Sequence, residues 1–126
     1  MTGRDVTMRA ITKNMNLTVG DSALDFRLTK LDAFSGAHLL KIISKASSDN
    51  LQDLILALPE PELDELMRTC LRSVSALLPA GPIPVLSNSG WGVPDLEYDA
   101  WSCLKLTMEV VSWTLEGFFP ESGSPS

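Results

Sequence analysis

The stretch "ITKNMNLTVGDSALDFRLTKL", residues 11–31, consists of two runs of alternating apolar and polar residues around a turn at Gly20-Asp21. The alternation breaks only at Lys13. The apolar members of the two runs are Ile11, Met15, Leu17, Val19, Leu24, Phe26 and Leu28. Successive side chains of a strand point to opposite faces, and Gly-Asp favours a tight turn, so the stretch predicts a β-hairpin over about residues 10–29. A hairpin alone is marginally stable, and we therefore expect helices to cover one of its faces.

From Leu31 onward the apolar spacing changes from two residues to three or four, which indicates helices. Asp32 is placed to cap the first of them. The expected helices cover 33–46, 49–58, 61–78, and a final stretch from Asp95 or Asp99 to about Phe118. The third has the cleanest pattern, with one apolar face that is unbroken as far as Leu78. The predicted fold is α+β, an N-terminal β-hairpin packed on a mostly helical domain of about four helices.

The local composition of the sequence also predicts the domain organisation. We expect a flexible N-terminus over 1–9, a single hairpin-plus-helices domain over 10–119, and a disordered tail over 120–126. Inside the domain, residues 79–94 read PAGPIPVLSNSGWGVP, and their four prolines and three glycines predict a long loop. Trp91 in that loop either tucks onto the core or serves as a platform for a partner.

The composition narrows the class of protein. A chain of 126 residues with 44% apolar and 21% charged residues fits one ordinary soluble domain. The N-terminus has no apolar signal sequence, and the most apolar helix carries Lys105, Glu109 and Glu116, so we expect no membrane association and a cytoplasmic location. A net charge of −6 argues against nucleic-acid binding.

The charge is unevenly distributed along the chain. Residues 1–45 hold seven Lys/Arg and four Asp/Glu, a balance of +3, whereas residues 46–126 hold three Lys/Arg and twelve Asp/Glu, a balance of −9. This asymmetry reflects solvated faces, or alternatively a head-to-tail association of identical chains.

The sequence shows no constellation of residues typical of an enzyme. Cys70 and Cys103 lie at apolar helical positions, which predicts reduced, buried thiols, and two cysteines with one histidine cannot close a zinc site. The acidic pairs Glu60/Glu62 and Asp64/Glu65 suit the start of a helix. His38 is accompanied by no nucleophile motif, so we interpret it as structural. We expect no catalytic residue, no cofactor and no metal.

The final helix has apolar residues on two sides. One stripe has the 3, 4, 3, 4, 3 spacing of a packed seam, and a second, shorter stripe lies roughly 150° away at about 100° per residue. The first stripe is Trp101, Leu104, Met108, Val111, Leu115 and Phe118; the second is Cys103, Leu106, Val110 and Trp113. We predict that the first stripe faces the core and that the second, together with Trp91, faces a second copy or a partner protein. The alternative is a helix that is central in its own domain.

The segment "FRLTKLDAFSGAHLLKIISKAS" resembles the entry of the tail assembly chaperones of long-tailed bacteriophages. In that family a hairpin strand leads into a K-L-x-A-F-like corner and then into a helix with a histidine. The matching residues here are Lys30, Leu31, Ala33, Phe34 and His38. The order of the later parts is also similar, from a leucine-rich middle and a Trp-containing loop to "PDLEYD" and a helix ending in "EGFF". The resemblance spans about residues 10–119. The family's arginine-rich continuation after the histidine is replaced by Lys41 and Lys45.

The resemblance implies a non-catalytic chaperone that binds the tape measure protein and helps recruit tail tube subunits in the host cytoplasm. Apart from the resemblance, the second stripe and the charge asymmetry lead us to expect a homo-oligomer, and the charge pattern leads us to expect binding to neither nucleic acid nor membrane. The alternative function is a small structural or connector protein that stays in the tail of the phage particle.

Overall fold

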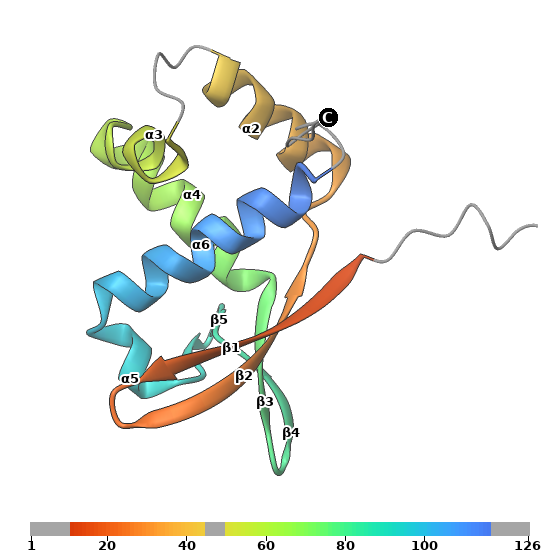
Figure 1. The fold of residues 1–126 in the computed structure, drawn as a ribbon, viewed down its shortest axis with the longest axis vertical. Helices are drawn as coiled ribbons and strands as arrows, with labels where there is room; N and C mark the ends of the chain where they lie inside the picture. The colour runs from red at the N-terminus through yellow and green to blue at the C-terminus, as the bar shows by residue number, and fades with distance from the viewer. Residues whose placement is uncertain (1–10, 45–49, 117–126) are drawn as a thin grey trace, which may run out of the picture.

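The computed structural model describes residues 11–44 and 50–116, and it pairs a four-stranded antiparallel sheet with a layer of helices (Figure 1). The sheet has the order β1-β2-β3-β4, with β1 (Thr12–Val19), β2 (Ser22–Thr29), β3 (Val74–Leu78) and β4 (Gly81–Pro84). The helices are α2 (Ala33–Ser44), α3 (Leu51–Leu56), α4 (Glu60–Arg72), α5 (Pro94–Glu97) and α6 (Ala100–Thr114). A short ribbon pairs β5 (Leu86–Ser87) with β6 (Gly90–Trp91). The predicted α+β class is confirmed.

The N-terminal hairpin forms where the alternation predicts it. Its strands pair from Thr12 with Thr29 to Val19 with Ser22, which leaves Gly20 and Asp21 as the turn. Gly20 has a φ of 63°, a conformation that glycine adopts without steric cost. The apolar residues of both strands share the face that packs on α6, and Phe26 and Leu28 on β2 are fully buried. The opposite face of these two strands is mostly polar and exposed.

The third helix is shorter than predicted. It ends at Arg72, and the residues expected to continue its apolar face, Val74 to Leu78, form strand β3 between β2 and β4. The sequence VSALL fits a helical face and a buried strand equally well. The ladders to β2 and β4 satisfy the backbone of this segment, so tertiary pairing overrides the helical pattern.

The prediction of a loop without regular structure over 79–94 is also wrong. Pro79 and Ala80 form the turn of a second hairpin, and the rest of the segment supplies β4, β5, β6 and the start of α5. Val85, Leu86 and Val93 are buried in this segment. The prolines are accommodated because β4 is an edge strand, where a missing N–H leaves no ladder bond unmade.

Helix α6 is central in the domain, as the alternative interpretation has it. Val111 faces apolar residues of α2, α3 and α4, whereas Glu109 and Trp113 reach strand β1 on the other side. Cys103, Leu106 and Val110 are at most 4% exposed. The prediction that these three residues face a partner is therefore wrong, because the chain's own sheet and helices bury both sides of α6.

The stripe predicted to face the core is buried in its middle and exposed at its start. Leu104, Val111 and Leu115 are buried and Met108 partly so, but Trp101 is 50% exposed. Phe118 lies outside the described residues, as do the predicted flexible N-terminus (1–9), the predicted disordered tail (120–126) and the end of the predicted first helix.

Candidate functional site

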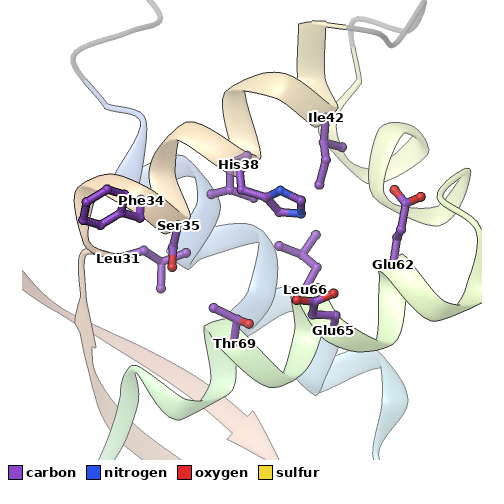
Figure 2. A pocket seen from close by; sticks show the side chains of 10 residues that line it. Leu31, Phe34, Ser35, His38, Ile42, Glu62, Glu65, Leu66 and Thr69 are labelled. Carbon is purple, nitrogen blue, oxygen red and sulfur yellow. The ribbon is translucent and has the colours of Figure 1, made fainter.

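A groove between α2 and α4 is the candidate binding site (Figure 2). It encloses about 250 Å³ and is more apolar than polar. The residues that line it are Leu31, Phe34, Ser35, His38, Leu39, Ile42, Glu62, Glu65, Leu66 and Thr69. The two walls of the groove are on separate helices, and the buried Leu39 and Leu66 lie at its base. A groove of this form could bind a segment of another chain.

The start of α2 is held in place by hydrogen bonds at both ends of the corner that precedes it. The Asp32 carboxylate accepts a hydrogen bond from the Ser35 backbone N–H at 2.8 Å, which confirms Asp32 as the cap. Hydrogen bonds from the Ser35 backbone and side chain lower the pKa of Asp32. The Leu31 backbone N–H donates to Thr114 Oγ1 at 3.0 Å, which ties the corner to α6. The first turn of α2, with Phe34, is therefore fixed relative to the core.

Phe34 is the most exposed apolar side chain of the groove. It is 88% exposed at one end of α2, although Gly36 and Leu39 of the same helix are buried. Phe34 lies about 140° around the helix from the buried Leu39, at 100° per residue, so no rotation of α2 could bury both against the same neighbour. A phenyl ring held in water on a fixed helix end is a candidate contact for an apolar partner.

The polar side chains of the groove come from both walls. His38 projects from α2 toward α4, and Glu62 and Glu65 project from the facing helix (Figure 2). The α4 wall is acidic, because it carries Glu62 and Glu65 and no Lys or Arg is among the described residues that line the groove. An apolar segment with Lys or Arg at its margin would complement this site.

A second groove lies between α4, α5 and the β5–β6 ribbon. It encloses about 380 Å³, and its lining includes Met67, Leu71, Trp91, Tyr98 and Cys103. Trp91 is half-buried against the core, and its position in β6 agrees with the interpretation that it tucks inward. Tyr98 is 88% exposed at the rim.

The five residues predicted for a partner interface do not form one surface. Trp91 and Cys103 share the second groove, where Cys103 is buried. Leu106 and Val110 are fully buried in the core. Trp113 is half-buried at the far end of α6, where its indole Nε1 donates to the Ile11 carbonyl and the Lys30 ammonium lies 4.6 Å from its ring centre.

Both cysteines are free and buried, as the sequence predicts. Burial raises the pKa of Cys70 to about 12. Burial, with a smaller contribution from the nearby Asp99 charge, raises the pKa of Cys103 to about 11. The Cys103 thiol donates to the Leu96 carbonyl at 3.1 Å. Both groups are therefore neutral thiols at physiological pH and poor nucleophiles.

The described residues also bear on two other kinds of site, a metal centre and a membrane span. Across residues 11–44 and 50–116, no group of three His, Cys, Asp or Glu side chains could hold a metal ion. In the same part of the chain, no helix combines the length and apolar character needed to span a bilayer. Comparison of the chain with protein-family models, with curated proteins and with solved structures gave no match.

Sequence reasoning missed the α2–α4 groove because it searched for apolar stripes, and Phe34 lies outside the stripe of its helix. The signal in the sequence that could have revealed the groove is the position of Phe34 away from the apolar stripe of its helix. A large aromatic residue opposite the buried face of a capped helix remains in solvent unless another chain covers it.

Proposed function

We propose that the protein is a non-catalytic tail assembly chaperone of a long-tailed bacteriophage, and that its α2–α4 groove binds the tape measure protein in the host cytoplasm. The observation that carries the proposal is that Leu31, Phe34 and His38, three of the residues on which the family resemblance rests, line one groove. Their neighbours in the resemblance, Lys30 and Ala33, flank the same corner.

The form of the groove supports an extended helical client. Its apolar floor and exposed Phe34 would receive apolar side chains spaced along one face of a helix. Glu62 and Glu65 would pair with basic residues beside that face, which favours one orientation of the client. Recruitment of tail tube subunits would then use surfaces of the chaperone outside the groove.

The proposal is tested by co-expressing the tagged chain with the tape measure protein of the same phage and measuring the complex that is recovered. Phe34→Asp should weaken the complex by about tenfold to hundredfold, because burying one phenylalanine side chain contributes roughly 1.5–3 kcal/mol. Tyr98→Asp is the matched control, since Tyr98 is equally exposed but lies at the second groove. Both variants should keep the wild-type circular dichroism spectrum.

Failure of the wild-type chain to bind the tape measure protein would contradict the proposal. Equal weakening by Phe34→Asp and Tyr98→Asp would show that the α2–α4 groove is not the binding site. The alternative function, a structural or connector protein of the tail, predicts the chain in purified phage particles, whereas a chaperone is absent from them.

A further inference from the structure

Strand β1 leaves one edge of the sheet open. In the order β1-β2-β3-β4, β1 pairs with β2 alone among the described strands (Figure 1). It is eight residues long, and all eight pair with β2 without a bulge. A long, regular edge strand presents a row of backbone donors and acceptors to which another strand can pair.

The register shows which backbone groups point to this open edge. The Lys30 N–H donates to the Ile11 carbonyl at 2.9 Å, so Ile11 and Lys30 form a hydrogen-bonded pair of the antiparallel ladder. Such pairs alternate along the strands, and the odd-numbered residues of β1 therefore direct their backbone groups toward β2. The residues whose N–H and C=O point to the open edge are Thr12, Asn14, Asn16 and Thr18.

The opposite edge of the sheet is protected, and β1 is not. The Val85 N–H donates to the Val74 carbonyl, and by the same alternation the backbone nitrogens of Pro82 and Pro84 point away from β3. Two outward positions of β4 thus lack a donor, a common protection of edge strands. Strand β1 has no proline, and the ammonium group of its single charged residue, Lys13, lies 3.7 Å from the Glu109 carboxylate.

We propose that β1 pairs antiparallel with β1 of a second copy of this chain, about a two-fold axis at Met15. Thr12 then faces Thr18 of the other copy and Asn14 faces Asn16, and each such pair exchanges two backbone hydrogen bonds. The two four-stranded sheets become one continuous sheet.

The composition of β1 favours a second copy over a different strand. With the axis at Met15, three kinds of opposed pair match, with threonine opposite threonine, asparagine opposite asparagine, and Ile11 opposite Val19. Lys13 faces Leu17, so no like charges are opposed. On the inner face, Met15 and Leu17 are half-buried and Ile11 is 59% exposed, and the added strand would cover these apolar side chains.

The first test measures the oligomeric state of the full chain by sedimentation equilibrium over a range of concentrations. The wild-type chain should dimerise. Asn14→Pro removes a donor that points to the open edge without touching the β1–β2 ladder, and by symmetry it removes two intermolecular bonds, so dimerisation should weaken by about tenfold to hundredfold. Asn14→Ala keeps the donor and should dimerise like the wild type.

The second test fixes the register and does not depend on the proline variant folding. With the two-fold axis at Met15, Met15→Cys brings two thiols opposite each other in a non-hydrogen-bonded pair, where mild oxidation should link them. Lys13→Cys separates the equivalent thiols by four residues along the strand and should not link. Cys70 and Cys103 are buried and should not compete.

A wild-type chain that stays monomeric would overturn the proposal. So would a dimer that Asn14→Pro leaves intact, or one that links through Lys13→Cys and not through Met15→Cys. Binding of a tape measure segment to β1 of a monomeric chain would also overturn it, because the strand that pairs with β1 would then belong to a different protein.

Discussion

The indole Nε1 of Trp113 donates a hydrogen bond to the backbone carbonyl of Ile11 at 3.1 Å and joins the last helix to the first strand across 102 residues of sequence. The same carbonyl accepts from the Lys30 N–H, and the Lys30 ammonium lies over the Trp113 ring. One side chain thus connects β1, the corner after β2 and α6. The spacing of apolar residues on α6 cannot reveal this role, because it does not show which strand crosses the helix.

The two tryptophans of α6 should respond to substitution in the reverse of the order that the stripes predict. Trp113→Glu should destabilise the fold, since it removes the bond to Ile11 and places a carboxylate against the half-buried end of the sheet. Trp101→Glu should be tolerated, because Trp101 is 50% exposed. Thermal unfolding followed by circular dichroism would decide, and a lower melting temperature for Trp101→Glu than for Trp113→Glu would contradict this assignment.

The side of α6 that carries Cys103, Leu106 and Val110 should behave as core. Leu106→Ala should lower the free energy of unfolding by about 2–5 kcal/mol, because Leu106 is fully buried and its truncation leaves a cavity. Leu56→Ala, at a position that is 51% exposed, is the matched control and should cost about 1 kcal/mol or less. Urea unfolding of both variants tests the comparison, and equal losses would argue against a central α6.

The local signals in the sequence were sufficient for the hairpin and for most helix starts. Alternation around Gly20-Asp21 predicts β1 and β2, and Asp32 and Asp99 are found as the caps of α2 and α6. These features depend on residues close together in the chain. A side-chain acceptor and the N–H groups it caps are at most three residues apart, so the sequence displays them directly.

The parts that the sequence did not predict depend on distant partners. Val74 to Leu78 has a pattern compatible with helix or strand, and the choice is made by β2, whose pairing residues lie about fifty positions earlier. The candidate site fails to emerge for a similar reason. Phe34 and Glu65 line the same groove only because the fold places α2 opposite α4, which lies later in the chain.

Two glycines should show opposite effects when changed to alanine. A Cβ at Gly36, inside α2, would meet Thr114 Cγ2 at 3.6 Å, an ordinary contact, so Gly36→Ala should stabilise the protein by up to about 1 kcal/mol through its better helix propensity. A Cβ at Gly92 would overlap the Pro84 carbonyl oxygen and lie 2.6 Å from Ile83 Cγ2. Gly92→Ala should therefore cost about 1–3 kcal/mol. Denaturant unfolding of the pair checks both signs, and a neutral Gly92→Ala would show that the segment before α5 can move away from β4.

The buried thiols should make the fold sensitive to alkaline pH. In the folded chain the pKa of Cys70 is about 12 and that of Cys103 about 11, against about 9 for an exposed thiol. Because the folded pKa is raised, the unfolded chain loses these protons first as the pH increases. The contribution of the neutral thiols to stability is complete below about pH 9 and is lost progressively between about pH 9 and the folded pKa values.

For Cys70, which is fully buried, this loss should reach about 1 kcal/mol at pH 10. Other groups also titrate there, so the informative quantity is the difference between the wild-type chain and Cys70→Ala. The variant should be less stable at pH 8, because truncation leaves a small cavity, but its free energy of unfolding should fall less steeply from pH 9 to pH 10.5. Urea unfolding at each pH measures both slopes. Parallel slopes would mean that Cys70 can reach water and ionise within the folded protein.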